Sequence, residues 1–201
     1  MFLLKSIRLK EINYIRKKLF QLNQTEIPTL ETLRLSLEKI KSEDQELIFR
    51  GLSHPEVIKY YGVSYSSFQE TKEQMEWYTN LEKSNSGMWW AIWLKDSKEF
   101  CGAIGYNGLM EEHKKAELGF WLLPEFWGKG IVQEAGQKVI QYFFRDLELH
   151  RIEAYVEAGN INSSKALKRL GFEHEGCLRD SEFKNGQFIS VDIFALLNPT
   201  P

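Results

Sequence analysis

The sequence predicts an α/β (α+β) fold, a mixed and mostly antiparallel sheet of about seven strands flanked by about four helices. Two β-rich runs, 88–94 and 100–107, are joined by a short polar connection and predict an antiparallel hairpin. Two later runs, 173–182 and 188–197, meet at a turn through Asn185 and predict a second hairpin. A strand, a helix and another strand lie between these hairpins, and this order predicts one parallel crossover within the sheet.

Length and composition favour a single globular domain. The chain has 201 residues, of which 43% are hydrophobic and 27% are charged. A net charge of −2 favours neither nucleic acid nor an acidic membrane as a partner. The apolar runs fall short of the roughly 20 residues that span a bilayer, and the chain starts with the wrong charge order for a secretory signal. Cys101 and Cys177 lack metal-site or disulfide spacing, which favours reduced thiols and a cytoplasmic protein.

The start of the chain differs from the rest, so we expect a basic N-terminal extension over 1–27 and the main domain over 28–201. Six basic side chains and one acidic side chain fall within residues 1–20. Apolar residues recur there at spacings of three and four, which predicts an amphipathic helix formed around Ile12, Ile15, Leu19 and Leu22. Such a helix either packs on the core or presents its basic face to a membrane or RNA.

The main domain is expected to open with a strand and two helices. Residues 32–37 alternate leucine with polar side chains, which predicts a strand that buries one face, made of Leu33, Leu35 and Leu37. A cap-like start predicts a helix over 42–52, which ends ahead of Pro55 because the residue before proline disfavours helical geometry. A second helix is expected over roughly 68–83.

The crossover carries the strongest local signal for function. Its expected elements are a strand over 116–123, a helix over 130–145, a strand over 152–156 and a short helix over 163–170. The first helix is preceded by Trp127-Gly128-Lys129-Gly130. Glycines let the backbone approach an anion, and the amides of a helix's first turn favour it, so this segment either binds a pyrophosphate or is a tight turn. It lacks the residues of a nucleotide P-loop and the third glycine of a dinucleotide fold, which excludes kinases, GTPases and dehydrogenases.

Two linked motifs resemble the GNAT acetyltransferase superfamily. They are the Trp-Gly-Lys-Gly segment and a later stretch with Asn160, Ser163 and Leu170-Gly171-Phe172. The runs Glu117-Leu118-Gly119-Phe120-Trp121 and Glu175-Gly176-Cys177-Leu178-Arg179 resemble its RimJ/RimL branch, which acetylates protein N-terminal amines. The resemblance covers about residues 30–197. It implies a GNAT fold whose sheet is splayed in the middle, with acetyl-CoA as co-substrate.

The resemblance also implies a set of residues that bind the cofactor. The strand residues would contact pantetheine and the thioester carbonyl, the glycine segment would wrap the pyrophosphate, and the second helix start would add further contacts. The set is Phe120, Trp121, Leu122, Trp127, Gly128, Lys129, Gly130, Ile131, Val132, Gln133, Asn160 and Ser163. Val132 departs from the family pattern, which has Gly or Ala there. Its branched side chain would crowd the diphosphate and so lower the affinity for the cofactor. Asn160 could instead be an ordinary turn residue without a contact to the cofactor.

Proton transfer needs an acid for the departing thiolate and a base for the attacking amine, which arrives largely protonated. Many family members use a tyrosine as the acid, but that position is Leu167 here. Ser163 is the alternative acid, unless it serves only as a helix cap. Glu182 matches the base of the RimL-like branch and is our first candidate. Glu117 matches a glutamate that other branches use through water, and each glutamate could instead be an ordinary exposed strand residue.

The sequence therefore predicts an acetyl-CoA-dependent N-acetyltransferase that works by direct attack of a primary amine. The resemblance favours a protein N-terminal α-amine, such as that of a ribosomal protein, as the acceptor. A polyamine, an aminoglycoside or an amino acid stays open as the acceptor, as does a non-catalytic acyl-CoA sensor. The four histidines lack ligand spacing, so no metal is expected. We expect a monomer or a homodimer.

Overall fold

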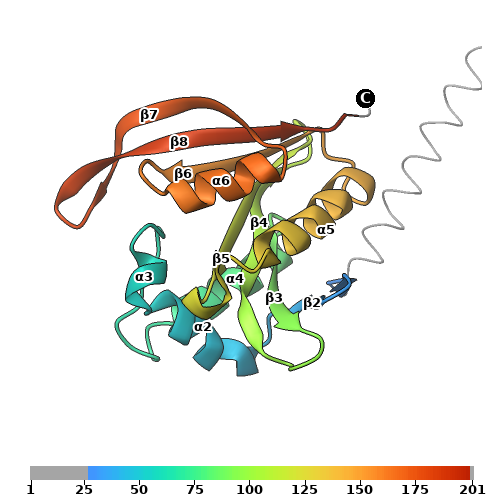
Figure 1. The fold of residues 1–201 in the computed structure, drawn as a ribbon, viewed down its shortest axis with the longest axis vertical. Helices are drawn as coiled ribbons and strands as arrows, with labels where there is room; N and C mark the ends of the chain where they lie inside the picture. Colours follow the sequence, from blue (N-terminus) through green and yellow to red (C-terminus); the bar gives the residue numbers. More distant parts are fainter. Residues whose placement is uncertain (1–26, 200–201) are drawn as a thin grey trace, which may run out of the picture.

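The computed structural model describes residues 27–199, which form one eight-stranded sheet covered by helices (Figure 1). The strand order is β1-β2-β3-β4-β5-β6-β8-β7. Within the described residues, every neighbouring pair is antiparallel except β5 and β6. This arrangement confirms the predicted mixed and mostly antiparallel sheet. The predicted basic helix lies outside the described residues.

The elements follow the predicted order with two small additions. The strands are β1 (Leu30–Glu31), β2 (Leu35–Lys39), β3 (Met88–Leu94), β4 (Phe100–Met110), β5 (Lys115–Leu122), β6 (Arg151–Glu157), β7 (Glu173–Lys184) and β8 (Gln187–Leu197). The helices are α2 (Gln45–Leu52), α3 (Pro55–Ile58), α4 (Lys72–Lys83), α5 (Ile131–Arg145) and α6 (Ile161–Arg169), with short 3-10 turns η1 (Ser42–Asp44) and η2 (Pro124–Phe126). The additions to the predicted elements are the two-residue β1 and the four-residue α3.

The first predicted strand is partly wrong. Leu33 was expected on its buried face, but this side chain is 91% exposed because it lies in a tight turn between β1 and β2. The hydroxyl of Thr32 closes that turn by accepting a hydrogen bond of 2.9 Å from the Leu35 amide. Leu35 and Leu37 are fully buried, as predicted. The second helix also starts later than expected, at Lys72, because a turn closed by Ser66 and Glu70 precedes it.

Helices cover both faces of the sheet, as two neighbouring tryptophans of β3 show. Successive side chains of a strand point to opposite faces. Trp90 meets Tyr142 of α5 with ring centroids 5.7 Å apart, whereas Trp89 meets Trp77 of α4 at 5.9 Å. Both β3 rings are buried. One face of the sheet therefore packs on α5, and the other packs on α4 and its neighbours.

The sheet splays between β5 and β6. These two parallel strands pair at only three positions, Lys115↔Arg151, Ala116↔Ile152 and Glu117↔Glu153. Beyond Glu117, β5 continues to Leu122 with no strand partner on this side among the described residues. Helix α6 lies alongside β6, and α5 runs from near the lower end of β5 toward the upper right (Figure 1). The splay predicted for the middle of the sheet is confirmed.

No helix within residues 27–199 is both long and apolar enough to cross a membrane.

We predict that Gly51→Ala destabilises the protein although alanine favours helices. A Cβ on Gly51 would stand 2.0 Å from a ring carbon of Trp121, which is buried and cannot move aside. Such overpacking costs about 1–3 kcal/mol, which exceeds the gain of up to about 1 kcal/mol from helix propensity. Urea unfolding monitored by circular dichroism measures the change. Gly62→Ala is the control, because a Cβ there meets nothing within 4 Å, and equal effects of both substitutions would contradict the prediction.

Candidate active site

A loop with two glycines connects the end of β5 to α5. Gly128 and Gly130 have φ angles of 72° and 75°, in the left-handed region that favours glycine. Gly130 is the N-cap of α5 and supplies no capping side chain. The indole of Trp127 donates a hydrogen bond of 2.9 Å to the Leu122 carbonyl, which folds the loop back onto β5. We call residues 127–130 the glycine loop.

The first turn of α5 presents free amides and the positive end of its dipole to the outside of this loop. Ile131 is buried, and Val132 packs against the core, so the fold accommodates both side chains of the predicted binding set. Gln133 donates from Nε2 to the Arg169 carbonyl at 3.1 Å and thereby joins α5 to the end of α6. The contacts predicted between these residues and a pyrophosphate therefore involve mainly backbone groups.

The predicted binding residues of β5 point largely into the protein. Trp121 and Leu122 are buried, and Phe120 is half-buried. The Trp121 ring packs on Phe100 with centroids 5.8 Å apart. These side chains fix the position of β5, and its backbone beyond Glu117 is the part left without a strand partner toward β6.

Helix α6 begins beside the splay and carries the other predicted residues. Asn160 is its N-cap, with Oδ1 accepting a hydrogen bond of 3.2 Å from the Ser163 amide. The Ser163 hydroxyl is half-buried and has no hydrogen-bond partner among the described residues. Leu167 is fully buried in the core. The helix start thus offers one free hydroxyl, and the tyrosine position of the family is a packing residue here.

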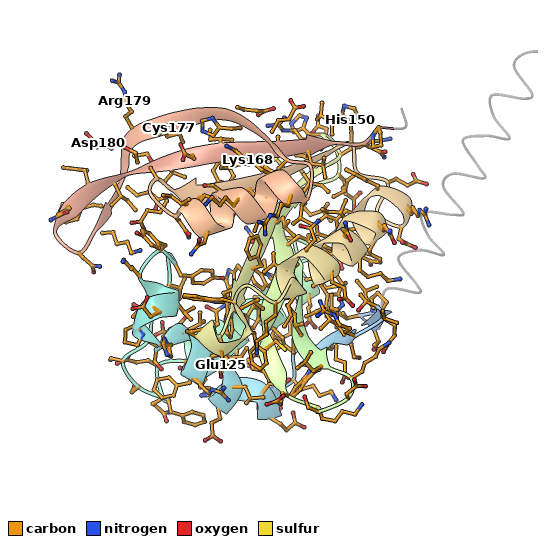
Figure 2. The ribbon with its side chains drawn as sticks, in the orientation of Figure 1. Glu125, His150, Lys168, Cys177, Arg179 and Asp180 are labelled. Atoms are coloured by element: carbon orange, nitrogen blue, oxygen red, sulfur yellow. The ribbon has the colours of Figure 1, made fainter. Side chains whose placement is uncertain are left out.

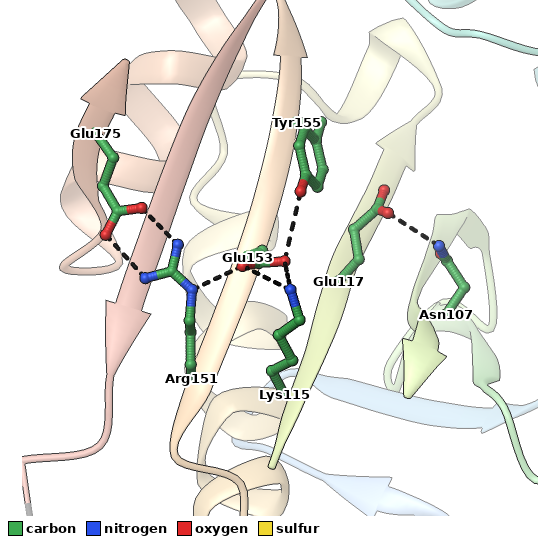
Figure 3. A network of polar contacts seen from close by, with 7 residues as sticks. All are labelled: Asn107, Lys115, Glu117, Arg151, Glu153, Tyr155 and Glu175. Carbon is green, nitrogen blue, oxygen red and sulfur yellow. Dashed lines mark hydrogen bonds and ion pairs between the residues drawn. The ribbon is translucent and has the colours of Figure 1, made fainter. Parts of the chain in front are cut away.

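Glu117 occupies the last paired position before β5 and β6 separate. In the sheet it lies between Asn107 of β4 and Glu153 of β6. The Asn107 side-chain amide donates to its carboxylate at 3.2 Å (Figure 3). Burial raises the pKa of Glu117, and the charges of Glu153 and Glu182 raise it further, against the lowering effect of Asn107. Glu117 is therefore a half-buried carboxyl that takes up a proton more readily than an exposed glutamate.

Glu153 is held ionised next to Glu117. Its carboxylate accepts from Arg151 Nε at 2.7 Å and from Lys115 Nζ at 3.1 Å. Partial burial opposes ionisation, but these two cations lower the pKa of Glu153 overall. Arg151 also contacts Glu175 through both terminal nitrogens, so the network extends to β7 (Figure 3). The negative charge beside Glu117 is consequently fixed in place.

Glu182, our first candidate base, lies on a more exposed element. It faces Ile189 in the β7–β8 hairpin, directly after a bulge in β7. Arg179 and Asp180 of this bulge stand on the outer side of the hairpin (Figure 2). Glu182 itself is exposed, although its charge acts on Glu117. Of the two candidate glutamates, Glu117 is therefore half-buried within the sheet, and Glu182 is exposed on the hairpin.

The hairpin is tied to the helical side of the protein by Lys184. Its Nζ donates to the Lys59 carbonyl at 2.8 Å and to Glu157 at 2.7 Å. The same side holds Tyr61, whose pKa is raised well above the usual value by burial and by the charges of Tyr78 and Glu117. A half-buried tyrosine on the segment that follows α3 therefore interacts electrostatically with Glu117.

Two residues of this site were missed by the sequence reasoning. Asn107 could have been found only from the register of β4 with β5, because it lies outside any motif. Tyr61 belongs to a loop that carries no recognisable motif. No group of three or more His, Cys, Asp or Glu that could hold a metal ion occurs among residues 27–199.

We predict that Gly128→Ala weakens both the fold and coenzyme A binding. A Cβ on Gly128 would meet nothing within 4 Å, so the substitution tests the left-handed backbone alone. Strain of about 1 kcal/mol is expected, and a loop that relaxes out of this conformation would misdirect the amides of α5. Urea unfolding and calorimetry with coenzyme A measure the two effects. Gly176→Ala is the control, since its site is open and its φ is not positive, and tighter binding by Gly128→Ala would contradict the prediction.

Comparisons with known proteins agree with this geometry. A model of the acetyltransferase (GNAT) domain family matches residues 34–173. The uncharacterized N-acetyltransferase YoaA of Bacillus subtilis is 35% identical over 173 residues, which cover 86% of this chain and 98% of that protein. The ribosomal-protein-serine acetyltransferase of Escherichia coli is 30% identical over 129 residues, which cover 64% of this chain and 71% of that protein.

A solved structure shows the same fold. The spermidine N-acetyltransferase of Vibrio cholerae, in complex with CoA and spermine, superposes with a TM-score of 0.73 at 24% identity and covers 83% of this chain and 96% of that chain. The family match extends over most of the chain, from Arg34 to Glu173, and the relatives include a ribosomal-protein acetyltransferase. The chain therefore belongs to the GNAT acetyltransferase family, in its RimJ/RimL-type branch, and is an acetyl-CoA-dependent N-acyltransferase.

Proposed function

We propose that this acetyltransferase modifies the α-amine of a protein N-terminus, with a ribosomal protein as the acceptor, and that Glu117 is its base. The observation that carries the proposal is the half-buried carboxyl of Glu117 at the point where β5 and β6 separate. The similarity to the ribosomal-protein-serine acetyltransferase of Escherichia coli supports the acceptor class. The cytoplasm, where ribosomal proteins are made, is the expected location.

The backbone groups of β5, the glycine loop and the first turn of α5 fit the parts of acetyl-CoA that we propose they bind. Acetyl-CoA supplies an activated acetyl group as a thioester. The unpaired edge of β5 beyond Glu117 offers backbone donors and acceptors to an extended pantetheine arm, in the manner of an added strand. The glycine loop and the first turn of α5 offer amides to the pyrophosphate. The unpaired strand edge lies at the start of the stretch from Glu117 to Gln133, and the glycine loop and first helical turn lie at its end.

In the proposed reaction the acceptor nitrogen attacks the thioester carbonyl, the nitrogen–carbon bond forms and the carbon–sulfur bond breaks. Glu117 takes the proton that the amine loses, directly or through a water molecule. Ser163 donates its hydroxyl proton to the departing thiolate, with the positive end of the α6 dipole favouring the developing charge, and is reprotonated from solvent. No covalent bond to the enzyme is needed.

The environments of the two glutamates favour Glu117 over Glu182. A base for an amine works best when its pKa is raised toward the operating pH. Burial and the fixed charge of Glu153 raise the pKa of Glu117 in this way. We assign to Glu182 the role of a second negative charge that attracts the cationic acceptor.

A polyamine is the second candidate acceptor. The spermidine N-acetyltransferase of Vibrio cholerae shares the fold, and the negative charges of Glu153 and Glu182 that act on Glu117 would also attract a polycationic acceptor. A sensor that binds acyl-CoA without turnover would not need Glu117 to have a raised pKa. The acceptor that becomes labelled with acetyl, if any, distinguishes these functions.

We predict that the ionisation of Glu117 sets the acidic limb of the pH profile of kcat. The base acts when deprotonated, so kcat falls as the pH drops through the raised pKa of Glu117. Asn107→Ala removes the hydrogen bond that favours the carboxylate, so the limb should move to higher pH. Glu117→Gln should abolish the limb and lower kcat about 10²–10⁴-fold. Glu175→Gln, which changes a more distant carboxylate of the same network, should leave the limb in place, and an unchanged limb in Asn107→Ala would refute the assignment.

We predict that mass spectrometry finds the transferred label on a protein N-terminus. Purified ribosomal proteins and a panel of polyamines are incubated with isotopically labelled acetyl-CoA, with Glu117→Gln as the inactive control. Label on an α-amine, which is absent when that amine has been chemically blocked before the incubation, supports the proposal. Label only on polyamines identifies the second candidate, and coenzyme A binding without any label identifies a sensor.

A further inference from the structure

We propose that Arg34 is a positioning residue for the acetyl-CoA pyrophosphate, which acts by neutralising Glu134 and holding the glycine loop in shape. Neither residue is among those that the sequence pointed to. The inference rests on the proposed binding of pyrophosphate by the glycine loop and is independent of the acceptor.

The carboxylate of Glu134 is fully engaged by the turn between β1 and β2. Its Oε1 accepts from the Thr32 hydroxyl at 2.6 Å and from the Arg34 amide at 2.9 Å. Its Oε2 accepts from Arg34 Nε at 2.7 Å. Although partial burial opposes ionisation, these hydrogen bonds lower the pKa of Glu134. Glu134 is consequently a fixed negative charge in the first turn of α5.

The other end of the Arg34 guanidinium rests on the glycine loop. Nη1 and Nη2 both donate to the Lys129 carbonyl at 3.2 Å. Nη2 also lies 3.6 Å from the place where a Cβ on Gly130 would stand. One planar cation therefore bridges the helix carboxylate and the backbone of the loop, in the forked geometry that arginine provides and lysine does not.

The charges give this bridge a role in binding an anion. A carboxylate in the first turn of a helix is favourable for the helix, but it would repel a pyrophosphate bound at the same end. Arg34 cancels that charge within hydrogen-bond distance. It also donates to the Lys129 carbonyl oxygen, so the partial negative charge of that oxygen competes less with the amides of the first turn of α5 for the pyrophosphate.

Stability alone does not account for the arrangement. The ion pair is about half exposed on the arginine side, with side-chain exposures of 47% and 21%, and such pairs contribute little to folding. Lys39 and Glu82, at the other end of β2, form a pair with nearly the same exposures of 46% and 21% but lie away from the glycine loop. They provide a matched control for the loss of an ion pair on this strand.

The test compares coenzyme A binding by Arg34→Ala, Lys39→Ala and the double variant Arg34→Ala/Glu134→Gln, measured by calorimetry on the full chain without acceptor. Arg34→Ala should weaken binding about tenfold, most strongly at low salt, because Glu134 is left unneutralised. The double variant should recover most of the affinity, since the repulsive charge is gone. Lys39→Ala should bind as the unmodified protein does.

A truncated cofactor separates pyrophosphate recognition from a general loss of structure. With acetyl-pantetheine, which lacks the pyrophosphate, Arg34→Ala and the unmodified protein should have the same kcat/KM. An equal loss with both cofactors, or no recovery in the double variant, would overturn the inference. If the unmodified protein bound coenzyme A and pantetheine equally well, the proposed pyrophosphate site itself would be wrong. That outcome differs from a failure of the inference about Arg34 alone.

Discussion

The separation of β5 and β6 after three paired positions is the constraint on which the rest of the site depends. Two parallel strands joined by a helix normally continue side by side, because each unpaired backbone group loses a hydrogen bond. Here they diverge, and the side chain of Gln133 joins α5, which follows β5, to the end of α6, which follows β6. The opening exposes a strand edge at one end and places Glu117 at the point of divergence.

The electrostatics of the site follow from that geometry. Because Glu117 and Glu153 are neighbours across the last paired position, their carboxylates must share a small region. The protein resolves this by giving both available cations to Glu153 and only a neutral amide to Glu117. The two groups thereby take different roles, one as a permanent charge and the other as a carboxyl able to exchange a proton.

Much of the fold could be predicted from the sequence, because it depends on local patterns. The predicted bounds of β3 match the observed ones because apolar side chains fill the run and polar residues end it. Leu33 was misplaced because alternation cannot distinguish a strand from a turn whose hydrogen bonds come from Thr32. The bridge of Arg34 to Glu134 was missed because it joins residues 100 positions apart, and only the packed structure brings them together.

The contact between Gly51 and Trp121 has a consequence for how such sequences vary. Helix α2 approaches β5 so closely that the indole occupies the space of a side chain on the helix. A larger residue at position 51 therefore requires a smaller one at position 121, and each change alone is disfavoured. Among proteins of this architecture the two positions should covary, and substitutions in α2 would reposition β5 and the unpaired strand edge that it carries.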